Sequence, residues 1–204
     1  MGRSENGGLA QHMENMREYS QIAGTAQIAR RYLAMNAFDG VLTTIGLLMG
    51  SYLSGVRNAG IVIRTGVATS IAMGISGLWG AYLTEAAERR RELAELENTM
   101  LTDLTQTKIG RASRLAVIIV ALVDGLAPFA AALIVLIPLL ATPLVGNILI
   151  SYALSMVVAL LSLFGLGMFL GHISGHNLIG YGLRTLVAGL VSIALSFLVG
   201  GAEP

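Results

Sequence analysis

The chain of 204 residues is 54% hydrophobic, only 12% charged, and has a formal net charge of +1. Soluble domains carry about 25% charged residues, so the composition predicts an integral membrane protein, and the near-neutral charge argues against a nucleic-acid partner. The chain contains no cysteine, which excludes disulfides, thiolate metal sites and cysteine nucleophiles. It also has no phosphate loop, nucleophile elbow or zinc-protease motif, so we do not expect an enzyme.

The first 34 residues are predicted to form a cytoplasmic N-terminal segment. Residues 9–33 look like an amphipathic helix that lies in the membrane interface before the first span. This polar start is unlike a cleaved signal peptide. Residues 35–204 are then expected to form one membrane domain.

Five apolar stretches predict an all-α, polytopic membrane fold, because a helix needs about 20 apolar residues to cross the hydrocarbon layer. They lie near residues 36–56, 60–84, 113–139, 143–171 and 180–201. Residues 85–112 are expected to carry the second helix into the cytoplasm and return, with a break at Gly110.

The basic residues predict the orientation of these spans. With the N-terminus in the cytoplasm, only Arg57 and Arg64 lie outside, which leaves 11 of the 13 lysines and arginines inside. Five spans then place the C-terminus outside.

A weak internal repeat pairs the first two spans with the third and fourth. The "FDG" around Asp39 matches the "VDG" around Asp124, and the span ends at Glu85 and His172 follow at similar separations. Each unit contains two spans, so the halves are expected to be parallel, as in some transporters.

Asp39 and Asp124 are the principal candidate site residues, as proton or cation pathway groups. A carboxylate at membrane depth costs roughly 2.5–3.5 kcal/mol on insertion scales and usually has a function. It either takes a proton, meets a cation or pairs with a base, and alternation of the first two is the chemistry of a cation/proton antiporter. The alternative is a packing role, in which Asp39 forms a hydrogen bond with a neighbouring backbone or hydroxyl group, such as that of Thr43 or Thr44.

Weaker metal candidates follow along the chain. Met73 supplies a thioether that suits Fe(II), although methionine is also ordinary apolar filling. Glu85 and Glu88, with Glu92 and Glu95, share one helical face and either collect divalent cations or form a solvated, salt-bridged face with the neighbouring arginines. His172 and His176 are four residues apart, a spacing that suits a metal or simply a polar helix end.

Glycines in the first two predicted spans indicate close helix packing. Gly46 and Gly50 form a small-xxx-small pair, and Gly74, Gly77 and Gly80 recur every three residues. Such patterns let helices approach closely in lipid, within a bundle or at a dimer seam.

Several of these stretches resemble the vacuolar iron transporter family. They are Phe38-Asp39-Gly40 with Thr43 and Thr44, "GAYLTEAAERRRE" after the second span, "PFAAALIVLIPLL" from Pro128, and the "GLGMFLG…GYGLRTLVAGLVSIALSFLVG" pattern over 165–200. The likeness covers about residues 28–201 and agrees with five spans and a cytoplasmic N-terminus.

The resemblance implies a homodimer that moves Fe(II) or Mn(II) out of the cytoplasm, apparently against protons, with the metal path between protomers or along the first two spans. Asp39 carries over as the pathway acid. The family's methionine and glutamate fall on Gly77 and Ala81 here, so Met73 and Glu85, one turn away, are expected to substitute. The family's best-studied branch has a larger acidic cytoplasmic domain, of which only Glu85, Glu88, Glu92 and Glu95 remain as candidates.

We therefore expect a divalent-metal exporter that uses proton antiport, holds no permanent cofactor and resides in a prokaryotic plasma membrane. Two alternatives stay open. One is a membrane scaffold or metal sensor that does not transport, supported by Gly77 and Ala81. The other is a proton-coupled carrier of a small solute, in which Asp39 and Asp124 serve only as proton sites.

Overall fold

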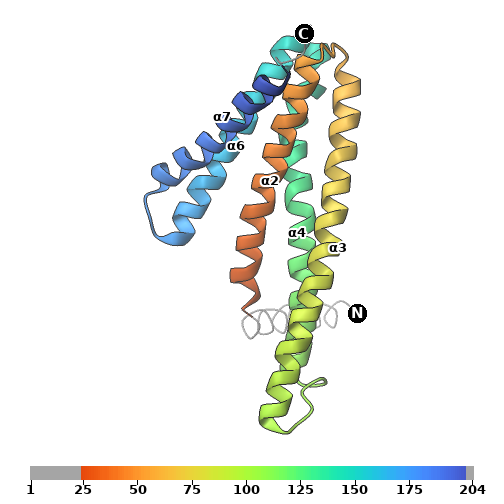
Figure 1. Cartoon of the computed structure of the whole chain (residues 1–204), viewed down its shortest axis with the longest axis vertical. Helices are drawn as coiled ribbons and strands as arrows, with labels where there is room; N and C mark the ends of the chain where they lie inside the picture. Colours follow the sequence, from red (N-terminus) through yellow and green to blue (C-terminus); the bar gives the residue numbers. More distant parts are fainter. Residues whose placement is uncertain (1–23, 201–204) are drawn as a thin grey trace, which may run out of the picture. The chain divides into compact units, whose positions relative to one another are not determined.

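The computed structural model describes residues 24–200, which are helical along most of their length and contain no strand (Figure 1). The helices are α2 (Thr25–Leu53), α3 (Ala59–Met100), α4 (Lys108–Leu140), the short α5 (Thr142–Val145), α6 (Ile148–Ser174) and α7 (Leu178–Gly200). The predicted interfacial helix over 9–33 lies largely outside the described residues. Its last part, from Thr25, belongs to α2.

Five of these helical segments are long and apolar enough to cross a membrane: α2, α3, α4 together with α5, α6 and α7. The prediction of an all-α integral membrane protein with five candidate spans is thereby confirmed. The fourth span, α6, begins at Ile148, later than the predicted start near residue 143. Gly146 adopts a left-handed φ of 71° after α5, and Asn147 caps α6 by accepting a hydrogen bond from the Leu149 N–H at 2.9 Å.

The predicted break at Gly110 is wrong. The chain leaves the helical conformation after Met100, where Leu101 has a φ of 51°, and Gly110 lies in the first turn of α4. A Cβ at Gly110 would lie 2.6 Å from the backbone oxygens of both Leu104 and Thr105. The glycine is therefore required by the close approach of the connecting loop, not by a helix end.

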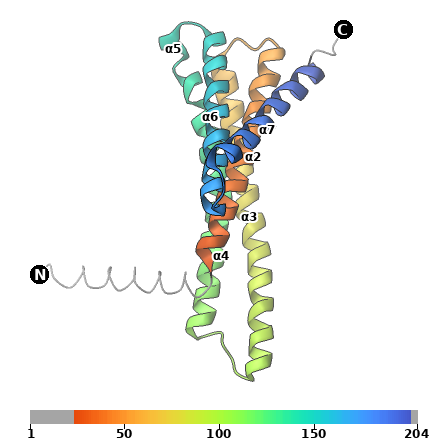
Figure 2. The ribbon, with the colours of Figure 1, turned by 90° about the vertical axis from the view of Figure 1, so that its left-hand side faces the viewer.

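The described residues form two compact units, and α2, α3 and α4 contribute residues to both. The first unit contains residues 24–32 and Gly77–Asp124, and the second contains Leu33–Ser76 and the chain from Gly125 to Gly200. In the first unit the end of α3 and the start of α4 run side by side in opposite directions (Figure 2). Glu97 holds the loop between α3 and α4 against the end of α3, because its carboxylate accepts hydrogen bonds from the Leu104 N–H at 2.8 Å and the Thr105 hydroxyl at 3.3 Å.

These hydrogen bonds predict that Glu97→Ala destabilises the loop between α3 and α4 locally. Leu104 is buried, so the variant leaves its N–H without an acceptor, and such a loss typically costs about 1–3 kcal/mol. Amide hydrogen exchange in the 101–107 connection should become about tenfold faster in Glu97→Ala and stay unchanged in Glu88→Ala, which alters an exposed position on the same helix. Equal protection from amide hydrogen exchange in the two variants would contradict this role of Glu97.

The second unit is built around buried apolar side chains of α2, α4 and α6. Ile45 and Leu48 of α2, Val135 and Leu139 of α4, and Leu163 of α6 are all fully buried in one cluster. Helices α6 and α7 pack along one another (Figure 1). Small residues permit these contacts, as is typical of helices that pack in lipid.

Candidate functional site

Asp39 lies on a largely exposed face of α2. Asp39, Thr43, Gly46 and Gly50 are spaced 4, 3 and 4 residues apart, which places them on one side of the helix. Asp39, Thr43 and Gly50 are exposed, and a Cβ built at Gly46 or Gly50 would meet no atom within 4 Å. We call these four residues the open face of α2.

The opposite side of α2 explains why this face points outward. Val41, Ile45 and Leu48 are fully buried in the core of the second unit. Gly40 sits against α4 so tightly that a Cβ there would lie 2.5 Å from the Pro128 carbonyl oxygen. Since packing fixes the rotation of α2, the side chain of Asp39 is directed away from the core.

Asp39 makes no hydrogen bond or ion pair with any residue of the described chain. The packing alternative required a hydrogen bond to a neighbouring backbone or hydroxyl group, such as that of Thr43 or Thr44. The Thr44 hydroxyl is buried and instead donates to the Gly40 carbonyl oxygen at 2.8 Å. Asp39 and Thr43 thus form an exposed pair of oxygen-bearing side chains one turn apart.

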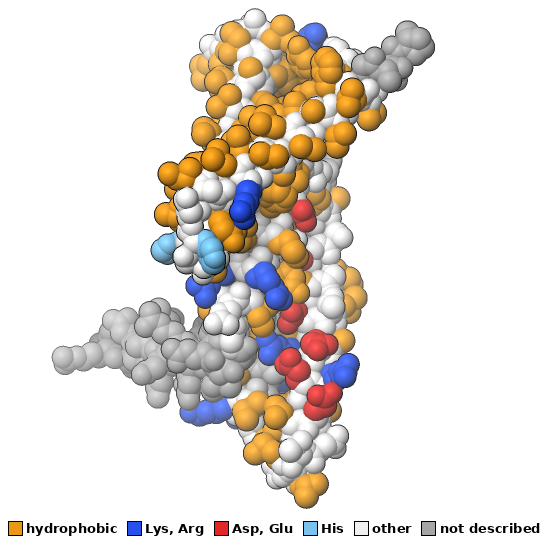
Figure 3. Space-filling view, turned by 60° about the vertical axis from the view of Figure 1, so that its left-hand side comes forward, with side chains coloured by type: hydrophobic (Ala, Val, Ile, Leu, Met, Phe, Trp, Pro, Cys, Tyr) orange, Lys and Arg blue, Asp and Glu red, His pale blue; other side chains and the backbone are white. Residues whose placement is uncertain are grey.

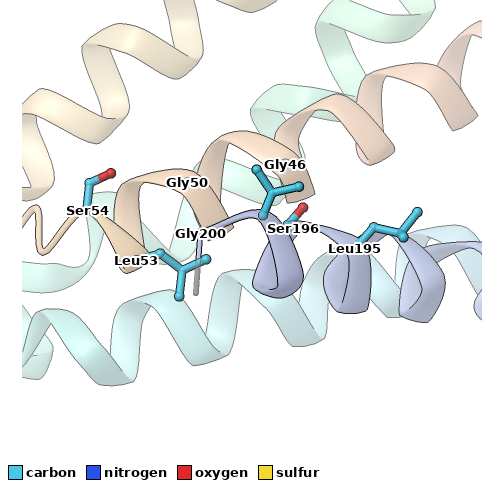
Figure 4. A pocket seen from close by; sticks show the side chains of 8 residues that line it. Gly46, Gly50, Leu53, Ser54, Leu195, Ser196 and Gly200 are labelled. Carbon is cyan, nitrogen blue, oxygen red and sulfur yellow. The ribbon is translucent and has the colours of Figure 1, made fainter. Parts of the chain in front are cut away.

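The open face continues into a groove of about 410 Å³ between α2 and α7 (Figure 4). Its walls are Gly46, Gly50, Leu53, Ser54, Leu195, Ser196, Val199 and Gly200. The only polar side chains in this wall are two serines, so the groove lacks the charged ligands that a divalent cation prefers. Its small and apolar lining suits helix packing or lipid.

A second group of polar residues forms in the first unit around Tyr32. The Tyr32 hydroxyl donates to Glu85 Oε1 at 3.4 Å, and Glu85 Oε2 lies 3.7 Å from Arg89 Nε. Asp124 is only 7% exposed, and its carboxylate packs against α3, where a Cβ at Gly77 would lie 3.0 Å from Oδ2. Both carboxylates are near enough to Tyr32 to act on its hydroxyl electrostatically.

This arrangement brings together Glu85 and Asp124, which were predicted as separate candidates. It also includes Arg89, one of the arginines expected to pair with the glutamate stripe, and Tyr32, which the sequence did not single out. Tyrosines are common at the membrane interface near the start of a span, so the type and position of Tyr32 did not indicate a functional site. The contact depends on how α2, α3 and α4 pack.

The remaining glutamates of the predicted stripe form an exposed, salt-bridged surface. Arg89 Nη1 lies 3.1 Å from Glu92, Arg91 Nε lies 3.0 Å from Glu95, and Glu88 is exposed. Acidic and basic side chains intermingle over this part of the molecule (Figure 3). The salt-bridged alternative therefore describes Glu92 and Glu95, and such exposed pairs contribute little to stability.

The other metal candidates are not assembled by the described chain. Met73 is half-buried in α3. His172 and His176 are exposed, and α6 ends at Ser174, so they do not share one continuous helical face. Across residues 24–200, no three His, Asp or Glu side chains lie together in a position to hold a metal ion.

The fold and composition define this chain as an α-helical integral membrane protein with five candidate spans. No family model matches the sequence. The chain is similar to an uncharacterized protein of the archaeon Methanocaldococcus jannaschii, with 27% identity over 168 residues that cover 81% of this chain and 84% of the relative. The likeness extends over most of both chains, but that protein's name assigns no activity that bears on this chain.

Proposed function

We propose that this protein exports a divalent metal, Fe(II) and also Mn(II), from the cytoplasm in exchange for protons. The observation that carries the proposal is Asp39, an exposed carboxylate within a membrane-spanning helix that has no partner in the described chain. An unpartnered acid at that depth is expensive and marks an ion or proton pathway. The resemblance of Phe38-Asp39-Gly40 and its surroundings to vacuolar iron transporters supports a metal as the transported ion.

The working unit is proposed to be a homodimer in which two copies of the open face meet. A Cβ at Gly46 or Gly50 would meet no atom within 4 Å, so α2 of a second copy has room to approach closely at these glycines. A two-fold interface would bring the two copies of the open face together. Asp39 and Thr43 of the two copies would then supply carboxylate and hydroxyl oxygens to one ion. A metal that uses Asp39 requires such additional ligands, because Asp39 is not part of a three-ligand group in the described chain.

The exchange cycle follows from the acid–base chemistry of Asp39. The deprotonated carboxylate binds the cation on the cytoplasmic side, and protonation from the other side releases it. Met73 would add a soft ligand, and Glu85, Glu88, Glu92 and Glu95 would raise the metal concentration at the entrance. Asp124 would serve as a second, buried proton site.

The orientation and the repeat belong to the same proposal. Eleven of 13 basic residues lie inside when the N-terminus is cytoplasmic and the C-terminus is outside. In a parallel two-span repeat, Asp124 would be the counterpart of Asp39. We further propose a prokaryotic plasma membrane as the location.

A membrane scaffold or metal sensor on the same fold is the second candidate function. The ion pairs of Glu92 and Glu95 favour the scaffold, because those carboxylates already have cationic partners. Metal titration of the protein in detergent, compared with a variant in which all four glutamates of the stripe are changed to glutamine, separates the two functions. A scaffold would bind no metal in either form, and a sensor that uses these glutamates would lose its binding of metal in the variant, whereas an exporter would keep the binding that depends on Asp39.

The dimer predicts cross-links at the open face. The chain has no cysteine, so Gly46→Cys or Gly50→Cys introduces a single thiol. Oxidation in liposomes should convert most of either variant into a covalent dimer, because residues near a two-fold axis come within the 3.5–4.5 Å Cβ separation that a disulfide requires.

The matched control for this cross-link is Gly165→Cys. Gly165 is exposed on α6, and a Cβ there also meets no atom within 4 Å, but it is remote in sequence from α2. It should stay monomeric on oxidation. Cross-linking of Gly165→Cys as readily as Gly46→Cys, or none at either α2 position, would contradict the proposed interface.

A further inference from the structure

A groove of about 380 Å³ lies between α3 and α4 in the first unit, and Arg89, the partner of Glu85, is one of its lining residues. The helices on either side of it are those that run antiparallel in Figure 2. Its lining combines basic and apolar side chains: Tyr82, Ala86, Arg89, Arg90, Leu93, Thr105, Gly110, Ser113, Arg114, Val117 and Ile118. No acidic residue is among them.

Two of the three arginines in this groove are available to an anion. Arg89 is engaged with Glu85 and Glu92. Arg90 is exposed and forms no ion pair with any residue between 24 and 200. Arg114 donates one Nη2 hydrogen bond to the Thr105 carbonyl oxygen at 2.7 Å, which leaves its other N–H groups for a further acceptor.

These arginines lie where both helices change from polar to apolar. On α3 the charged run that includes Arg90 follows the apolar stretch ending near Thr84, and on α4 Arg114 immediately precedes the apolar stretch from Leu115. The groove therefore has a cationic part next to an apolar part, with Tyr82 and Ile118 both exposed on the apolar side. A free phosphate would use only the arginines, whereas a phospholipid would also occupy the apolar wall.

We propose that this groove binds an anionic phospholipid. The phosphate accepts hydrogen bonds from Arg90 and Arg114, and an acyl chain lies along Tyr82 and Ile118. Guanidinium groups suit phosphate oxygens in geometry and charge, and basic pockets between membrane helices are a known type of lipid site. The site does not depend on the proposed transport function.

The single tryptophan, Trp79, provides an intrinsic probe. The residue is 62% exposed, and the centroid of its ring lies 6.3 Å from that of Tyr82, a residue of the groove wall. Trp79 is roughly 16 Å along α3 from Arg90, at about 1.5 Å per residue, which is the depth of acyl-chain carbons rather than of a headgroup. Lipids that carry bromine in the middle of the acyl chain quench tryptophan fluorescence on contact.

The experiment uses the full chain in mixed vesicles of phosphatidylglycerol and phosphatidylcholine, with bromine on one lipid or the other. Brominated phosphatidylglycerol should quench Trp79 more than its mole fraction predicts, and brominated phosphatidylcholine less. Each arginine should contribute about fivefold to this preference, the equivalent of about 1 kcal/mol per basic residue near an anionic surface. Arg90→Gln with Arg114→Gln should therefore remove the preference, and Arg90→Lys with Arg114→Lys should keep part of it.

Arg57→Gln with Arg64→Gln is the matched control, because both arginines are exposed but lie outside this groove. This control should keep the full preference, as should wild type in millimolar inorganic phosphate. The proposal is overturned if the two brominated lipids quench in proportion to their mole fractions. It is equally overturned if the control pair removes the preference, or if inorganic phosphate abolishes it, which would indicate a site for a free anion.

Discussion

Asp39→Asn is expected to abolish metal transport while leaving the fold intact. The asparagine side chain has nearly the same shape but cannot exchange a proton or neutralise a cation. Asp39 is exposed and has no partner in the described chain, so no packing contact or ion pair is lost. Uptake of Fe(II) and Mn(II) into proteoliposomes should fall by about two orders of magnitude, because even partners of metal ligands change affinity 10–100-fold.

Two comparisons test whether the loss of transport is caused by the loss of the carboxylate. Asp39→Asn should elute from a sizing column as wild type does and unfold at the same temperature. Asp39→Glu, which keeps the charge and moves it by one methylene, should retain measurable transport. Full transport by Asp39→Asn would show that Asp39 is not the coupling acid.

Gly40→Ala, one residue further along α2, is expected to disrupt the fold instead. A Cβ at Gly40 would lie 2.5 Å from the Pro128 carbonyl oxygen and 2.7 Å from its Cα, and backbone atoms cannot rotate out of the way as a flexible side chain can. Overpacking of this kind costs typically 1–3 kcal/mol. The unfolding temperature, followed by circular dichroism in detergent, should fall by roughly 5–10 °C, or the variant should fail to accumulate.

Gly165→Ala is the matched control for this effect. It makes the same substitution within a helix, at a position where a Cβ meets no atom within 4 Å. Since alanine is the better helix former by about 1 kcal/mol, this variant should be as stable as wild type or slightly more stable. A similar loss of stability in both variants would point to glycine itself, not to the α2–α4 contact.

Much of the fold is predictable from the sequence because the decisive signal is local. Apolar runs of membrane-spanning length identify the five candidate spans without any knowledge of their neighbours. Helix ends are less predictable, since they depend on contacts made elsewhere. Gly110 looks like a helix breaker in isolation, yet its place in α4 reflects the nearby carbonyl oxygens of Leu104 and Thr105.

The candidate site is likewise predictable only where its signal is local in the sequence. Asp39 and Asp124 stand out as charges within apolar runs, but the sequence does not distinguish the exposed one from the buried one. That difference arises from the rotation of each helix in the bundle. Tyr32 is joined to Glu85 across 53 positions of sequence, a relation that no local pattern contains.

The most direct test of the central proposal is Fe(II) uptake by wild-type protein in proteoliposomes with an acidic interior, measured together with the internal pH. An exporter that exchanges metal for protons should accumulate Fe(II) only while the gradient lasts, and the interior should become less acidic in step with metal entry. Mn(II) should compete with Fe(II) for entry. Folded protein that moves no Fe(II), or uptake that ignores the pH gradient, would contradict metal/proton exchange.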